Sequence, residues 1–188
     1  MGVGLSWVGV YQGFSVLWVV FGGGGRYGVD MTVLTVPVVR NIREAAVVAG
    51  EFDHVVTVGP SGGEVVWGHP DHIVRTFGDV SWGPEGPRYE QIVDVLNWAS
   101  DRDGSMLVHC HAGMSRSTAT AWGIMVGKGA DAEEAMIALR DAHPCDTWGR
   151  RHFIPNRLIM EHVARFYGLG EGRVNDIRVR CTDHGRWS

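Results

Sequence analysis

Cysteine is scarce in this chain of 188 residues, which holds only Cys110, Cys145 and Cys181. An odd number at wide spacing argues against a disulfide scaffold and favours a reducing compartment, so we expect a cytoplasmic protein. No second cluster of cysteine and histidine has the spacing of a zinc site, so we expect neither a metal nor a cofactor. The net charge of −4 offers no broad basic surface, and nucleic acid is not an expected partner.

A long hydrophobic run is also missing. The apolar stretch of residues 7–21 is short for a membrane span, is followed by glycines at 22–25, and lacks a basic leader and an obvious cleavage site. We therefore interpret residues 1–30 as an accessory extension rich in glycine and aromatic residues. Membrane anchoring is the less favoured alternative. Met31 opens a strand-like stretch, and it is a candidate for the natural start of the protein.

The chemistry is concentrated in residues 109–118, which read His-Cys-His-Ala-Gly-Met-Ser-Arg-Ser-Thr. Cys110 and Arg116 lie six positions apart, behind an apolar strand predicted over 105–108 and before a helix that begins near Ser115. The intervening turn would direct several backbone N–H groups into one concavity at the positive end of the helix, an arrangement that favours a bound phosphate.

Residue types in this turn fit phosphate chemistry. Gly113 permits a backbone that a Cβ would resist, and Arg116 can direct two parallel N–H donors at two phosphate oxygens. The same field stabilises a thiolate, so Cys110 becomes a nucleophile aimed at phosphorus; the alternative is a small buried hydrophobe at a strand end. The predicted phosphate-binding residues are His111, Ala112, Gly113, Met114, Ser115 and Arg116.

This loop resembles the signature of the cysteine-dependent protein tyrosine phosphatases, most closely their dual-specificity branch: His-Cys, five residues, then Arg-Ser. The resemblance extends over about residues 31–168, which we take as a phosphatase catalytic domain. It implies that Cys110 accepts the phosphoryl group, that Arg116 and loop amides hold its oxygens, and that a separate aspartic acid protonates the leaving oxygen. It also implies that Ser117 hydrogen-bonds to the Cys110 sulfur, an interpretation we favour over the alternative of a plain first-turn helix residue.

Asp79 is the candidate general acid, because expelling an alkoxide or phenoxide requires a proton. It lies 31 residues before Cys110, in a segment that resembles the family's Phe-Asp-Asp, with Gly78 in place of the first aspartate. Glycines and prolines nearby predict a loop that closes over substrate. Asp71, Glu85 and Asp103 are competing acids, and a solvated turn carboxylate is the alternative for Asp79.

Four further residues receive supporting roles. Ser115 would cap the following helix, His109 would order the loop by hydrogen bonding, and His111 would line its rim. Asn156 lies in Arg-His-Phe-Ile-Pro-Asn, which resembles the family's Arg-Pro, Pro-Asn segment. That resemblance implies that Asn156 positions the hydrolytic water, while helix capping is the alternative.

Strand and helix patterns alternate from Met31 onward, which predicts an α/β fold with a central, mostly parallel sheet flanked by helices, like that of dual-specificity phosphatases. The predicted strands cover residues 33–39, 53–58, 64–67, 72–77 and 105–108. The predicted helices cover residues 41–50, 88–100, 117–127 and 131–143. A last helix is predicted to open in residues 151–156 and to run to Tyr167, with Pro155 in its first turn. Residues 169–188 are expected to be a loosely ordered C-terminal tail.

The predicted partner is a phosphoprotein substrate. The short domain predicts a shallow site that accepts phosphotyrosine, phosphoserine and phosphothreonine. Phosphoinositides are disfavoured because the loop between Cys110 and Arg116 has no lysine, and RNA 5′ ends remain an alternative substrate. A catalytically weak phosphate-binding module is the alternative outside the enzymes.

Overall fold

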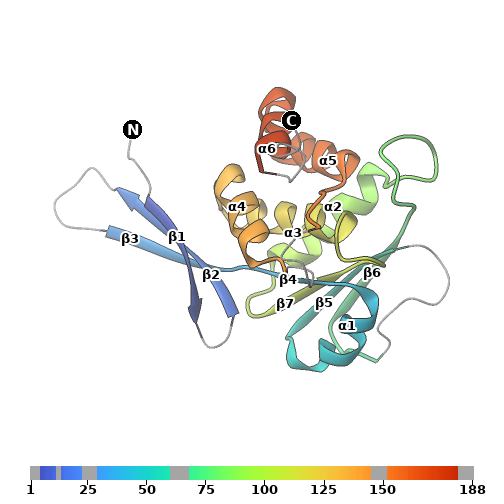
Figure 1. Cartoon of the computed structure of the whole chain (residues 1–188), viewed down its shortest axis with the longest axis horizontal. Coiled ribbons are helices and arrows are strands. Elements are labelled where there is room, and N and C mark those ends of the chain that lie inside the picture. The colour runs from blue at the N-terminus through green and yellow to red at the C-terminus, as the bar shows by residue number, and fades with distance from the viewer. Residues whose placement is uncertain (1–4, 12–13, 23–28, 60–67, 145–151, 182–188) are drawn as a thin grey trace.

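The computed structural model describes residues 5–11, 14–22, 29–59, 68–144 and 152–181, and it contains two separate sheets (Figure 1). The strands are β1 (Leu5–Tyr11), β2 (Phe14–Gly22), β3 (Val29–Thr35), β4 (Val38–Arg40), β5 (His54–Gly59), β6 (His72–Thr76) and β7 (Met106–His109). The helices are α1 (Ile42–Val48), the 3-10 helix η1 (Ala49–Glu51), α2 (Tyr89–Ser100), α3 (Arg116–Gly127), α4 (Ala132–Ala142), α5 (Arg157–Tyr167) and α6 (Glu171–Cys181).

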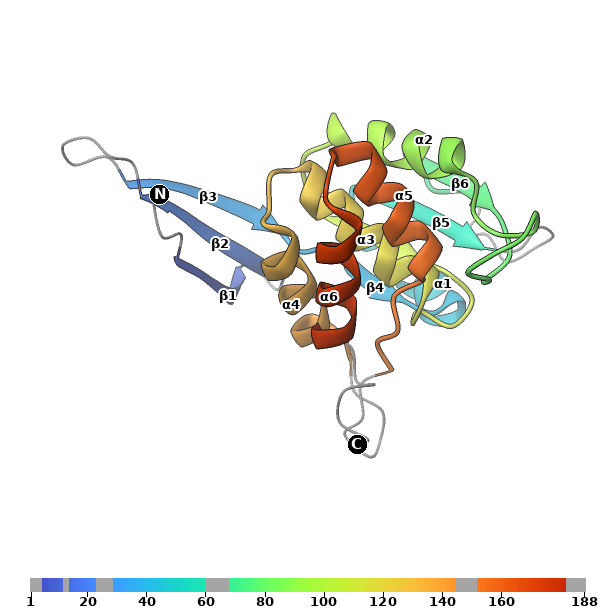
Figure 2. The ribbon, with the colours of Figure 1, turned by 90° about the horizontal axis from the view of Figure 1, so that it is seen from above.

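The central sheet has the order β4-β7-β5-β6, and every neighbouring pair is parallel. Both of its faces are covered: α1 and η1 lie on one face, and α2 to α6 gather on the other (Figures 1 and 2). β7 lies inside the sheet and is buried throughout, which suits its apolar sequence. The predicted α/β fold is confirmed, and the carboxyl end of β7 leads directly into the Cys110 loop.

Helix patterns in the sequence were reliable guides to burial. In α2, the four predicted apolar positions, Ile92, Val95, Leu96 and Ala99, are the buried ones. α3 is buried on nearly all sides over its first ten residues, as expected for a central helix. The Asn41 side chain accepts hydrogen bonds from two backbone N–H groups of α1, and Asp131 does the same for α4.

Strands β1, β2 and β3 form an antiparallel sheet of their own, in the order β1-β2-β3, which projects away from the helices (Figure 2). The single strand predicted over 33–39 is wrong: β3 ends at Thr35, and β4 starts at Val38 in the other sheet. Pro37 lies between them and lacks the N–H group that would continue a ladder. β3, which belongs to the antiparallel sheet, thus continues past residue 30 to Thr35. No described helix is long and apolar enough to cross a membrane.

The expectation of a loosely ordered tail is wrong for residues 171–181, which form α6. Val174, Ile177 and Cys181 are buried in the main core, and their spacing places them on one helix face. The prediction that Pro155 lies in the first turn of α5 is also wrong, because Asn156 is the N-cap and Pro155 precedes it. The strand predicted over 64–67 lies outside the described residues.

Candidate active site

The loop after β7 turns tightly because Gly113 adopts φ +74° and lies against the chain that links β4 to α1. A Cβ on Gly113 would be 2.7 Å from the backbone nitrogen of Asn41, closer than such atoms can approach. The Ile42 N–H donates to the His111 carbonyl at 3.2 Å, which ties the loop to the same turn. Glycine is therefore required here for both its conformation and its small size.

Cys110 is buried, and its sulfur faces the inside of the loop. The Gly113 N–H donates to Cys110 Sγ at 3.2 Å, and the Ser117 hydroxyl lies 3.1 Å from the same sulfur. Two polar groups therefore meet at the same sulfur. The structure thus brings together Cys110 and Ser117 as the sequence predicted.

Arg116 begins α3 and is 5% exposed. Its Nη1 donates to the carbonyl of Phe77 at 2.9 Å, so the guanidinium holds the chain that leads into the Asp79 loop. Its Nε is buried and makes no hydrogen bond to any described residue. A buried cationic donor without a partner is costly unless a guest supplies an acceptor.

Asp79 extends over this loop from the segment after β6. Its carboxylate accepts hydrogen bonds from Ser115 Oγ at 2.7 Å and from Asn156 Nδ2 at 2.9 Å. Its other oxygen lies 3.7 Å from Arg116 Nε, an ion-pair distance too long for a hydrogen bond. Asp79 is therefore the carboxylate that the fold places against Ser115 and Arg116 of the Cys110 loop.

The structure explains why glycine stands at position 78, where the similar segment of the family has aspartate. Its N–H donates to the Glu85 carbonyl at 2.7 Å, and a Cβ there would lie 2.9 Å from that oxygen. The Gly86 N–H donates to the carbonyl of Gly83, so the loop is closed by its own backbone. This loop carries both Asp79 and the competing Glu85.

The other two competing acids lie at the opposite end of the parallel sheet. Asp71 precedes β6 and accepts hydrogen bonds from Arg102 and His54, and Asp103 precedes β7 and lies near Lys128. In a parallel sheet the amino-terminal ends of all strands lie at one end of the sheet, and the carboxyl-terminal ends lie at the other. Neither carboxylate can therefore protonate a group bound at Cys110.

Two supporting residues do more than the sequence indicated. Ser115 occupies the N-cap position of α3 but makes no side-chain cap, because its hydroxyl donates to Asp79 instead. Asn156 caps α5 with its Oδ1, which accepts from the Ile159 N–H, while its Nδ2 holds Asp79 and the Val80 carbonyl. The capping alternative for Asn156 is thus confirmed, together with a contact to the acid.

The role expected for His109 is filled by another histidine. His143, which follows α4, places Nε2 2.9 Å from the Gly113 carbonyl and packs edge-on against Phe153. Sequence reasoning missed it because thirty residues separate His143 from Gly113. His111 and Ala112 are exposed at the rim of the loop, as expected for His111.

His109 instead faces the neighbouring strand β5. Its Nε2 lies 2.6 Å from the Thr57 hydroxyl, which also lies 2.7 Å from His72 Nε2. Burial lowers the pKa of His109 from 6.5 to about 4, and burial also lowers the pKa of His72. His109 is therefore neutral near pH 7 and ties the nucleophile strand to β5 rather than ordering the loop.

The described residues contain no group of three or more histidine, cysteine, aspartate or glutamate side chains that could hold a metal ion.

No family model matches the chain, and no curated protein matches it. Among solved structures, the chain is similar to Tk-PTP in its active form, with 22% identity, a TM-score of 0.47, and coverage of 74% of this chain and 91% of that one. A glycine-to-alanine mutant form of Tk-PTP is 22% identical with a TM-score of 0.47, over 73% and 89% of the two chains.

Proposed function

We propose that this chain is a cysteine-dependent phosphatase that hydrolyses phosphate monoesters on proteins through a cysteinyl-phosphate intermediate. The observation that carries the proposal is the buried Nε of Arg116, which makes no hydrogen bond to any described residue, in a loop whose cysteine sulfur receives a hydrogen bond from the Gly113 amide. A cationic concavity beside a nucleophile suits a phosphate ester, whose oxygens are held by the donors while its phosphorus faces the cysteine.

The first chemical step uses three residues. The Cys110 thiolate attacks phosphorus, the bond from phosphorus to the ester oxygen breaks, and Asp79 gives that oxygen its proton. Arg116 and the loop amides hold the phosphoryl oxygens while charge develops. Ser115 and Asn156 position Asp79 by the hydrogen bonds described above.

The second step returns the enzyme to its starting state. A water molecule attacks phosphorus, Asp79 accepts a proton from it, and the sulfur–phosphorus bond breaks to release phosphate. The Ser117 hydroxyl at 3.1 Å from Cys110 Sγ stabilises the departing thiolate. Each bond formed is thus matched by one broken, and no cofactor takes part.

The proposed substrates are phosphotyrosine, phosphoserine and phosphothreonine in proteins. The resemblance to the dual-specificity branch supports this range, and the lysine-free loop argues against phosphoinositides. A reducing compartment such as the cytoplasm suits a thiolate nucleophile.

One observation favours a second candidate, a phosphate-binding module with slow turnover. Asp79 already contacts Ser115 and Arg116, the groups that a bound phosphate would engage. While Asp79 remains bound to Ser115 and Arg116, it cannot protonate a leaving oxygen. Slow release of these contacts would therefore give slow turnover of a bound phosphate. Tight phosphopeptide binding with little hydrolysis would distinguish this candidate from the phosphatase.

The experiment is hydrolysis of para-nitrophenyl phosphate between pH 5 and 8 with a chelator present, by the wild-type protein and by Cys110→Ser. We expect turnover in the wild type and a loss of at least about ten-thousandfold in the variant, because a serine hydroxyl in this loop is a far weaker nucleophile. Thermal unfolding of both proteins provides the control, since serine fills nearly the same space.

Two results would count against the proposal. Activity that survives Cys110→Ser would show that another group performs the chemistry. Wild-type protein without activity, but with phosphate affinity that depends on Arg116, would favour the binding module.

A further inference from the structure

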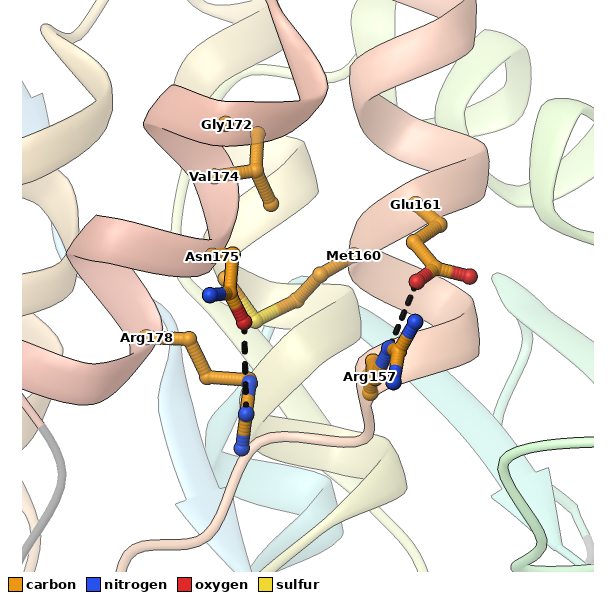
Figure 3. Close-up of a pocket in the computed structure, with 7 residues that line it drawn as sticks. All are labelled: Arg157, Met160, Glu161, Gly172, Val174, Asn175 and Arg178. Atoms are coloured by element: carbon orange, nitrogen blue, oxygen red, sulfur yellow. Dashed lines mark hydrogen bonds and ion pairs between the residues drawn. The ribbon is translucent and has the colours of Figure 1, made fainter.

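A second cationic site lies between α5 and α6, in a groove of about 260 Å³. Its walls are formed by Arg157, Met160 and Glu161 from α5 and by Val174, Asn175 and Arg178 from α6. Figure 3 shows Arg157 and Arg178 on opposite walls at the same end of the groove, with the Met160 side chain between the two helices. The groove therefore presents two guanidinium groups above an apolar floor.

The three arginines of α6 differ in their partners. Arg173 pairs with Asp131 at 2.6 Å and Arg180 pairs with Glu133 at 3.0 Å, so both hold α6 against α4. Arg178 turns to the other side, where its single hydrogen bond is a long one of 3.4 Å to the Asn175 amide oxygen. No described carboxylate pairs with it, and its Nε is buried without a partner. A partly buried guanidinium in this state gains most from an anion supplied by a ligand.

Arg157 supplies the second positive charge, at the amino-terminal end of α5. Its Nε donates to Glu161 at 2.6 Å, so one of the two guanidinium charges in the groove is balanced and one positive charge remains. The positive end of the α5 dipole lies at the same place and adds to this field. The whole chain carries a net charge of −4, so this groove is a local positive site on an acidic protein.

The groove adjoins the proposed phosphatase site through one residue. Asn156, directly before Arg157, donates its backbone N–H to the Ser115 carbonyl of the Cys110 loop and holds Asp79 with its side chain. Asn156 thus joins the Cys110 loop to the first residue of α5, Arg157, which lines the groove.

We propose that the groove binds a second anionic group, a phosphate or a carboxylate, on the same polypeptide that carries the scissile phosphate. The inference rests on the proposed function, because it assigns the substrate class of that enzyme: phosphoproteins with an acidic or doubly phosphorylated segment. Arg178 is the principal contact and Arg157 the second.

The test compares Arg178→Gln with the matched control Arg173→Gln, which removes a paired arginine from the same helix. Four substrates are used: para-nitrophenyl phosphate and three phosphotyrosyl peptides, with neutral residues, with aspartates, or with a phosphoserine beside the phosphotyrosine. We expect Arg178→Gln to lower kcat/KM about fivefold for the acidic and doubly phosphorylated peptides, as for a charged contact near the surface. The neutral peptide, para-nitrophenyl phosphate and the control variant should be unchanged.

Glu161→Gln sharpens the test in the opposite direction. It frees Arg157 and should raise kcat/KM for both anionic peptides. A loss confined to the doubly phosphorylated peptide identifies phosphate as the ligand, and equal losses for both peptides identify any anionic group. Equal kcat/KM in the wild type and Arg178→Gln for every peptide would overturn the proposal, and so would an equal loss for every substrate.

Peptide affinity of the Cys110→Ser protein, measured by fluorescence anisotropy with and without Arg178→Gln, separates this inference from the proposed function. If wild-type protein fails to hydrolyse para-nitrophenyl phosphate, the phosphatase proposal fails. Arg178-dependent affinity for the anionic peptides would then still support the groove as a binding site. Loss of that dependence in a protein with normal turnover would overturn the groove alone.

Discussion

The two ends of the parallel sheet differ in how completely their charged groups are hydrogen-bonded. At the end where strands begin, Asp71 accepts hydrogen bonds from Arg102 at 3.0 Å and from His54 at 2.8 Å, and Asp53 accepts from the backbone and hydroxyl of Ser105. Arg102 also lies over the Trp98 ring at 4.0 Å. Every carboxylate in this group has partners, and the contacts join β5, β6 and the segment before β7.

At the end where strands finish, polar groups are left incomplete. Arg116 Nε and His109 Nδ1 are buried without a hydrogen bond to any described residue. The sulfur of Cys110, a residue of the main core cluster, accepts a hydrogen bond from the Gly113 N–H and lies 3.1 Å from the Ser117 hydroxyl. Hydrogen-bonded charges at the first end stabilise the fold, whereas at the other end Arg116 Nε, although 3.7 Å from Asp79, still has a hydrogen bond to give.

Arg116→Lys should break this contrast most severely. Lysine keeps the positive charge but cannot direct two parallel donors, so we expect kcat/KM for para-nitrophenyl phosphate to fall about a thousandfold. Inhibition by inorganic phosphate should weaken in parallel. Unfolding is followed by circular dichroism to show that the fold survives, and phosphate inhibition at wild-type strength would contradict the role given to Arg116.

Asp79→Asn tests the acid at the same end. The amide cannot donate the proton in the same way, so hydrolysis of an alkyl phosphate should slow about a hundredfold. Para-nitrophenyl phosphate should slow less, because its leaving group needs little protonation. The measurement is kcat for both substrates, and equal slowing would assign the acid to another residue.

His109→Gln sharpens the comparison through pH. Burial lowers the pKa of His109 from 6.5 to about 4. Between pH 4 and pH 6.5, His109 is therefore protonated in the unfolded chain but neutral in the folded one. This contribution to stability is complete above pH 6.5 and is lost as the pH falls toward 4, by up to about 3 kcal/mol. Glutamine does not titrate and can keep the contact with Thr57.

The difference in unfolding free energy between wild type and His109→Gln is therefore expected to change from pH 7 to pH 4, in favour of the variant at low pH. Urea unfolding at several pH values measures it. Parallel stability curves for the two proteins would mean that His109 is not shielded from protons.

Asp71→Asn should have the smallest effect, and it falls on stability alone. The pair with Arg102 is partly exposed, so we expect a loss of about 1 kcal/mol in unfolding free energy at pH 7 with kcat/KM unchanged. The hydrogen bond from Arg102 lowers the pKa of Asp71 below 3.8, so the wild-type advantage disappears as the pH falls through that lowered value. A large loss of kcat/KM in this variant would show that the two ends are coupled.

Sequence reasoning worked where a signal is local. The apolar spacing in α2, the caps at Asn41 and Asp131, and the glycine of the Cys110 loop each depend on residues within a few positions of one another. The tail was missed although Val174, Ile177 and Cys181 repeat at helical spacing, because its arginines outweighed that signal.

Contacts between distant segments could not be predicted in the same way. Nothing near Thr57 or His143 in the sequence indicates that their partners are His109 and the Gly113 carbonyl. The position of Asp79 was predictable from its resemblance, but its bonds to Ser115 and Asn156 required the folded chain. Pairing across strands and loops depends on tertiary structure, which a single sequence does not display.

The contact of Gly113 with the turn after β4 also has a meaning for folding kinetics. The loop that holds Cys110 is shaped by residues about seventy positions earlier in the chain, so it cannot form by local collapse alone. Its geometry is completed only when β4 has paired with β7 and α1 has docked. The proposed phosphate site is therefore expected to appear during refolding only after this pairing, later than helix content that forms from local contacts.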